Sequence, residues 1–204
     1  MKKLIISEVL KDSLSIAFKN ILSLIGAFLL WVITIWIPYL NVGTTIAICS
    51  IPLELSRGNV INPTFIFDSK YRKRMGEFFL LMAFMYSAMI VGMFFLIVPA
   101  IVISYAFSLA IYIMIDKEVN PLQAVKMSND CTYGNKWRMF FINLIVGLIM
   151  GVAMGIVSIF INISVVVWVV LYMAVMLISF SWLMSINAVY YRELSANSET
   201  LAAE

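Results

Sequence analysis

Apolar and polar residues alternate in long blocks along this chain, and the blocks predict its topology. The apolar stretches cover residues 21–55, 77–115 and 139–188, and a short turn divides each of them into two helical halves. A helix needs about 20 apolar residues, within a range of about 17–25, to cross the hydrocarbon core of a membrane. Five segments meet that length, at residues 20–38, 77–97, 99–115, 139–161 and 164–188.

The sixth candidate, residues 41–55, is short and contains Pro52. If it did not return across the membrane, Arg57 and the bases at 70–74 would lie outside, against the positive-inside rule. We therefore expect an all-α integral membrane protein with six transmembrane helices arranged as three hairpins. A re-entrant hairpin that enters and leaves on the cytoplasmic face is the alternative for the first pair.

The charges give the orientation. The chain has 14 Lys and Arg and 11 Asp and Glu, and all of them lie at the same ends of the hairpins or in the tails. The opposite turns, at residues 38–43, 96–100 and 160–164, carry no charge. Because cytoplasmic loops carry the excess of Lys and Arg, we expect both termini in the cytoplasm. We expect a multi-pass protein of the inner membrane of a prokaryote.

A polar or amphipathic segment of similar length precedes each hairpin, at residues 7–19, 62–74 and 120–130. The second and third begin with Asn62-Pro63 and Asn120-Pro121, and Asn is a good helix N-cap while Pro favours the first helical position. The pattern predicts a cytoplasmic interfacial helix before each hairpin, in one domain over 1–204 with a flexible polar tail at 193–204. Parallel repeats over 7–55, 62–115 and 120–188 are one interpretation; ordinary polar connections between hairpins are the other.

Composition excludes much chemistry. The chain is 63% hydrophobic and 12% charged, against about 25% charged in soluble domains. It contains no His, which removes His-activated nucleophiles and the commonest metal ligand. No ionisable residue falls mid-span, as proton-coupled transporters usually require. We expect no enzyme activity, no cofactor, no metal and no nucleic-acid partner. An acid/base pair among the inner carboxylates is the minority alternative: Glu54, Asp68, Glu77, Asp116, Glu118 and Asp130.

A glycine pattern marks the fifth span. Gly147, Gly151 and Gly155 recur every four residues, and Asn143 lies one step earlier on the same face. Glycines at this spacing let another helix approach closely, which favours helix association in lipid. The stripe predicts helix packing, either within the chain or as a glycine zipper between copies of a homo-oligomer.

A basic cluster lies on the second connecting segment and consists of Lys70, Arg72, Lys73 and Arg74. Each base near an anionic leaflet contributes about 1 kcal/mol. The cluster therefore predicts binding to anionic lipid headgroups or to an acidic partner, unless it only sets the topology.

Two pairs of serines lie at helical spacing in the fourth and sixth spans: Ser104 with Ser108, and Ser181 with Ser185. Such pairs either line a polar path or, as serines in membrane helices commonly do, hydrogen-bond a backbone or a neighbouring helix.

Residues 96–140 carry a recognisable motif. Its members are Pro99, Asp116, Pro121, Ala124, Ser128, Thr132, Gly134 and Trp137. This stretch resembles a signature of small bacterial six-helix membrane proteins of unknown function, and of the membrane domain fused to some glycerophosphoryl diester phosphodiesterases. Ala100 stands where that pattern usually has Gly, which implies a less sharp turn. The resemblance implies the fold but no activity, because this sequence contains no segment that we expect to form the phosphodiesterase catalytic domain.

Two functions follow from these patterns. The first is a homo-oligomeric pore or passive pathway for ions, small solutes or lipid, based on the glycine and serine stripes. The second is a membrane scaffold or accessory subunit that recruits a partner or anionic lipid through its basic face.

Overall fold

All the regular secondary structure is helical in the part of the chain that the computed structural model describes, residues 3–95, 97–162 and 164–202. The elements in chain order are α1 (Ile6–Thr34), α2 (Pro38–Cys49), α3 (Ile51–Ser56), η1 (Pro63–Phe67), α4 (Ser69–Lys73), α5 (Met75–Phe94), α6 (Ile97–Phe107), α7 (Ala110–Asp116), α8 (Pro121–Thr132), α9 (Lys136–Ser158), η2 (Ile159–Asn162) and α10 (Val165–Ala202). The all-α class is confirmed.

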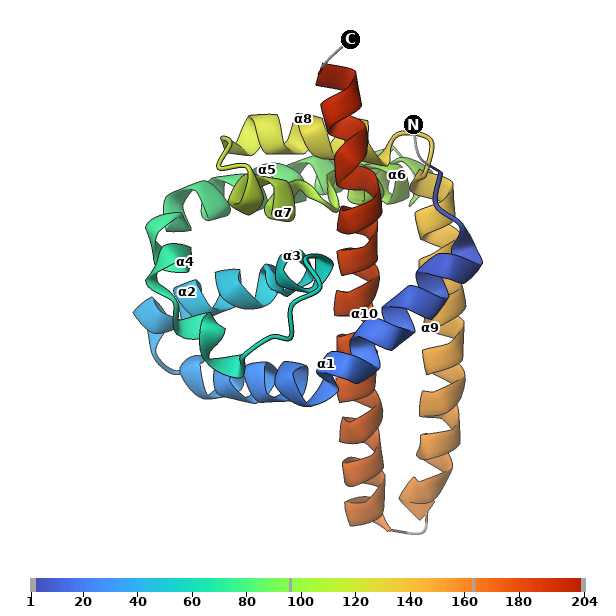
Figure 1. Ribbon diagram of the computed structural model, residues 1–204. Helices are drawn as coiled ribbons and strands as arrows, with labels where there is room; N and C mark the ends of the chain where they lie inside the picture. Colours follow the sequence, from blue (N-terminus) through green and yellow to red (C-terminus); the bar gives the residue numbers. More distant parts are fainter. Residues whose placement is uncertain (1–2, 96, 163, 203–204) are drawn as a thin grey trace.

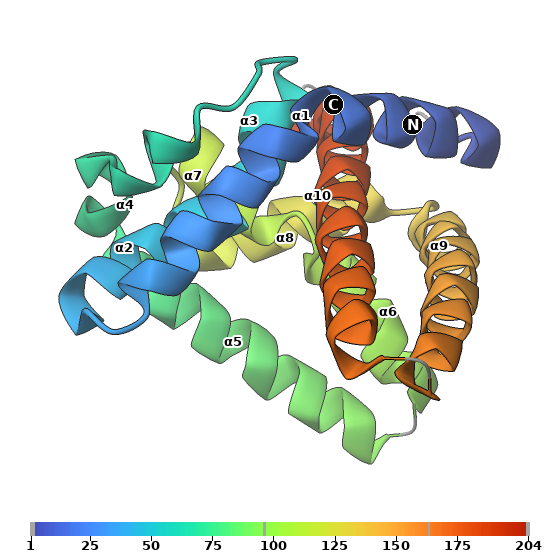
Figure 2. The ribbon, with the colours of Figure 1, turned by 90° about the horizontal axis from the view of Figure 1, so that it is seen from below.

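Five helical stretches are long and apolar enough to cross a membrane: Ile6–Thr34, Met75–Phe94, Ile97–Asp116, Lys136–Asn162 and Val165–Ser195. They indicate a multi-pass membrane protein. Consecutive helices pack in pairs, α1 with α2, α5 with α6 and α9 with α10. However, α5 and the second half of α1 run across the axis of the α9–α10 pair rather than alongside it (Figures 1 and 2). Six transmembrane helices arranged as three hairpins therefore stay a prediction.

Residues 41–56 form the centre of the molecule. None of them is exposed, and α3 packs against α10 while α2 packs against α1. The helix is interrupted at Ser50, whose Oγ donates to the carbonyl of Ala47 at 2.7 Å, and Pro52 follows in the first turn of α3. This segment can be short and broken because protein, rather than lipid, covers its sides.

The first amphipathic segment, 7–19, is not a separate interfacial helix. It is the first part of the 29-residue α1, which crosses α10 (Figure 1). Ser13 is fully buried at that crossing and accepts a hydrogen bond from Nε1 of Trp182 at 3.0 Å. Long-range packing against α10 therefore takes up a face that we expected to meet the membrane surface.

The two Asn-Pro starts are confirmed as helix caps. Oδ1 of Asn62 accepts from the backbone N–H of Thr64 at 3.1 Å, where η1 begins. Oδ1 of Asn120 accepts from the N–H of Gln123 at 2.9 Å, where α8 begins. Segment 62–74 is two short helices, η1 and α4, rather than one.

The last helix is longer than the predicted span 164–188, because α10 continues to Ala202. Residues 193–202, predicted as a flexible tail, are therefore helical, while 203–204 lie outside the described residues. Two residues of the predicted outer turns, Leu96 and Ile163, also lie outside them.

Ion pairs join those ends of the hairpins that the sequence assigns to one side of the membrane. Arg57 after α3 pairs with Asp116 at the end of α7. Arg192 on α10 lies 2.5 Å from Asp12 near the start of α1. These ion pairs bring together charged residues that are far apart in the sequence, and the cytoplasmic orientation stays a prediction.

Candidate functional site

Asp116 is the centre of an ionic cluster that ties three helices together. One carboxylate oxygen pairs with Arg57 and the other accepts from the hydroxyl of Tyr191 at 2.5 Å. Arg57 also lies 3.4 Å from Glu54. Burial lowers the pKa of Arg57, but Asp116 and Glu54 outweigh it and hold the pKa above its usual value. The cluster links the ends of α3 and α7 to Tyr191 within α10 and leaves these groups engaged with one another.

Beside this cluster lies a cleft of about 330 Å³, which we call the basic cleft. It is at the lower end of the roughly 300–1,000 Å³ typical of ligand pockets. Its residues come from α2, α4 and the segment around the end of α7: Ile46, Lys70, Tyr71, Lys73, Arg74, Ile115 and Glu118. Three cations thus meet two apolar side chains and one carboxylate.

Lys70 is partly engaged by neighbouring carboxylates. Its Nζ lies 3.6 Å from Oε1 of Glu54 and 3.7 Å from Oδ2 of Asp68, and 4.9 Å from the ring centroid of Tyr71. Burial lowers the pKa of Lys70, but the neighbouring Tyr71 and Glu54 help to raise it above its usual value. Lys70 therefore stays charged, and its side chain is also 53% exposed.

Arg74 has a structural role as well. It donates to the carbonyls of Met114, at 2.5 Å, and Glu118, at 3.0 Å. Its Nε lies 3.1 Å from Oε2 of Glu77. All three guanidinium nitrogens are thus occupied, and they hold the start of α5 against the end of α7. The charge of Arg74 still contributes to the potential of the cleft.

Arg72 does not share the cleft with the other three bases. A Cβ built on Gly43 would lie 2.5 Å from Cγ of Arg72, so the stem of Arg72 packs directly on α2 at that glycine. The cluster predicted from sequence is therefore divided: Lys70, Lys73 and Arg74 line the cleft, and Arg72 packs beside it. The absence of a Cβ at Gly43 is what permits this close approach.

Tyr71 is 2% exposed and lines the same cleft. Its hydroxyl lies near Ser50 and Lys70, yet among the described residues neither approach has the geometry of a hydrogen bond. Burial raises the pKa of Tyr71. A buried donor without a partner is costly, but this oxygen is covered by protein and does not face the open part of the cleft.

The glycine stripe is open in this structure. A Cβ on Gly147, Gly151 or Gly155 would meet nothing within 4 Å in the described chain. The expectation that these glycines pack against another helix of the same chain is therefore wrong. An intermolecular contact stays a prediction.

Asn143 behaves differently from the glycines below it. Its Nδ2 donates to the hydroxyl of Tyr105 at 3.2 Å, and its Oδ1 accepts from Tyr190 at 3.1 Å. It therefore joins α9 to both α6 and α10 within the chain.

A close backbone approach does occur, at Gly92 of α5. A Cβ there would lie 3.1 Å from Cα of Ala100 and 2.9 Å from Cδ1 of Ile103. This contact connects α5 to α6. A single glycine carries no repeating pattern, so this contact could not be predicted from the sequence.

The four serines bond their own helices. Each hydroxyl donates to a backbone carbonyl three or four residues earlier, at 2.8–2.9 Å, which accounts for Ser104, Ser108, Ser181 and Ser185. Ser181 and Ser185 are also buried among helices. Their contacts favour structural serines over a polar path.

The inner carboxylates do not converge on one cleft. Glu118 lines the basic cleft, whereas Glu54 lines an adjacent one with Asn59 and Phe65. Glu54, Asp68, Glu77 and Asp116 are held in ion pairs with Lys and Arg, which does not favour a shared acid/base pair.

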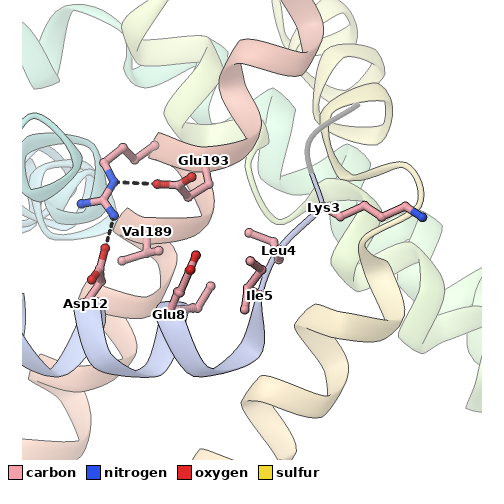
Figure 3. Close-up of a pocket in the computed structure, with 9 residues that line it drawn as sticks. Lys3, Leu4, Ile5, Glu8, Asp12, Val189 and Glu193 are labelled. Carbon is pink, nitrogen blue, oxygen red and sulfur yellow. Dashed lines mark hydrogen bonds and ion pairs between the residues drawn. The ribbon is translucent and has the colours of Figure 1, made fainter.

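A further pocket, of about 70 Å³, separates the start of α1 from α10. Figure 3 shows Glu8, Asp12 and Glu193 around it, with Lys3 pointing away. Arg192 bridges Asp12 and Glu193. The arrangement fixes α1 to α10 and leaves little room for a ligand.

Comparison with family models, with curated proteins and with solved structures finds no match. The resemblance to the membrane domain of glycerophosphoryl diester phosphodiesterases therefore stays a prediction.

Proposed function

We propose that this chain is a non-catalytic membrane scaffold or accessory protein that binds a phosphate-bearing lipid headgroup in the basic cleft. The observation that carries this proposal is the meeting of Lys70, Lys73 and Arg74 over Ile46 and Ile115. A lipid has the same two parts, since its headgroup carries negative charge and its glycerol and first methylenes are apolar.

The position of the cleft supports a lipid rather than a soluble anion. It opens beside α5, whose sequence from Phe78 onward is apolar and largely exposed, as a lipid-facing helix is. Cations at the end of such a helix lie at headgroup depth. Lys73 is exposed and makes no ion pair or hydrogen bond with any described residue, so it is free to meet a phosphate.

The test is lipid binding to the purified protein in detergent, measured by native mass spectrometry with phosphatidylglycerol as the probe. Lys73→Gln should weaken binding. Lys11→Gln is the matched control, because Lys11 is an exposed lysine on α1 outside the clefts described above. Equal binding by wild type, Lys73→Gln and Lys11→Gln would refute the proposal.

A homo-oligomeric passive pathway is the second candidate, and the open glycine stripe on α9 favours it. Three positions without side chains offer a second copy a close approach. The serine contacts supply no polar route through one chain, so conduction would require a path between copies. Flux of a small dye from liposomes, measured with wild type and Gly151→Leu, separates this candidate from the first.

A further inference from the structure

The basic cleft contains two charged groups of opposite sign that lack partners. Neither the ammonium of Lys73 nor the carboxylate of Glu118 makes an ion pair or hydrogen bond with any residue the structure describes. The other two cations differ, because Lys70 lies near Glu54 and Arg74 lies near Glu77. The unmatched charges of the cleft are therefore one cation and one anion.

The backbone of Glu118 is held in an unusual conformation. Its φ is +53°, in the left-handed region that few residues with a Cβ adopt. It follows the end of α7, where glycine is the common residue. Arg74 fixes this turn by donating to the carbonyls of Glu118 and Met114. A carboxylate thus stands where glycine would suit the backbone, at the edge of a cation-lined cleft.

We propose that the basic cleft takes a headgroup that carries a primary ammonium beside its phosphate, as an ethanolamine phospholipid does. This inference rests on the proposed function. Lys73 meets the phosphate and Glu118 accepts hydrogen bonds from the ammonium, so Glu118 is the specificity-determining residue.

The chemistry of the alternatives explains the choice. A primary ammonium has three N–H donors, and its bonds to a carboxylate are charge-assisted. A glycerol headgroup has no cation for Glu118. A choline headgroup has a cation without N–H donors. A phosphate monoester brings a second negative charge toward Glu118. An ethanolamine headgroup matches both unpaired charges.

The experiment compares ethanolamine, glycerol and choline phospholipids with identical acyl chains, in competition for the purified protein under native mass spectrometry. Wild type should prefer the ethanolamine lipid over the glycerol lipid by roughly two- to fivefold, the ratio expected of an exposed ion pair. Glu118→Gln should bring that ratio close to one. Lys73→Gln should weaken all three lipids, and Lys11→Gln should change nothing. Circular dichroism checks that each variant is folded.

The outcomes separate the two proposals. If Lys73→Gln weakens binding but Glu118→Gln keeps the ethanolamine preference, the headgroup assignment is overturned and the proposed function stands. If Lys73→Gln has no effect, both are overturned. Soluble phosphoethanolamine should fail to displace the lipid at equal concentration, because it lacks the apolar part; equal displacement would overturn the lipid as occupant.

Discussion

The contact at Gly92 offers a quantitative test of the α5–α6 packing. In Gly92→Ala, the new Cβ would lie 3.1 Å from Cα and 3.3 Å from the backbone N of Ala100. Backbone atoms cannot rotate away, so the two helices must move apart. Overpacking of this kind typically costs about 1–3 kcal/mol. Against it stands the higher helix propensity of Ala, about 1 kcal/mol. The net expectation is a destabilisation of roughly 0–2 kcal/mol.

Gly147→Ala is the matched control, because its Cβ would meet nothing within 4 Å. It should show only the propensity gain. The free energies of unfolding of the two variants should therefore differ by about 1–3 kcal/mol, whatever the propensity term is in a micelle. Titration with sodium dodecyl sulfate in mixed micelles, followed by circular dichroism, measures both.

A second variant locates the strain. The Cβ of Gly92→Ala would also lie 2.9 Å from Cδ1 of Ile103, and Ile103→Val removes that methyl group. In a double-mutant cycle, Ile103→Val should cost less in the Gly92→Ala background than in wild type. Equal shifts for Gly92→Ala and Gly147→Ala would refute the close approach altogether.

Three further predictions concern other parts of the molecule. Gly151→Leu should leave the stability of the monomer unchanged, since its face is open, and should shift any oligomer toward monomer in size-exclusion chromatography; a loss of monomer stability would contradict the open face. Trp182→Phe removes the hydrogen bond to Ser13 and should cost about 0.5–1.5 kcal/mol of unfolding free energy, whereas Trp36→Phe, at a residue 85% exposed, should cost almost nothing; equal costs would contradict the buried crossing. Substituted cysteines should react with an impermeant thiol reagent from outside at Tyr39, Val98 and Ser164, of which Tyr39 and Val98 are exposed, but not at Ser69; outside labelling at Ser69 would contradict the predicted topology.

Local features of the fold were predictable from the sequence. The caps at Asn62 and Asn120 depend on a few neighbouring residues, and both form as expected. The apolar blocks predicted the long helices, because crossing a membrane imposes a minimum length. Five of them have that length and composition.

Features that depend on distant contacts were not predictable. Segment 7–19 is amphipathic by itself, but only the crossing with Trp182 shows that its polar Ser13 is buried. Likewise, four neighbouring bases gave no sign that Arg72 packs on Gly43 while Lys73 stays free. The contribution of Glu118 to the cleft depends on a left-handed turn, which the residue type does not favour.

The buried position of residues 41–56 has a consequence for biogenesis. Within this segment, α3 packs mainly against α10. Helix α10 begins at Val165, about 110 residues after α3 ends. At about 5–20 residues per second, α10 reaches the membrane roughly 5 to 22 seconds later. During that interval the helix break at Ser50 and the carboxylate of Glu54 lack their final cover. We therefore expect the nascent chain to hold α3 at the membrane insertion machinery, or against the bilayer surface, until the last helix arrives.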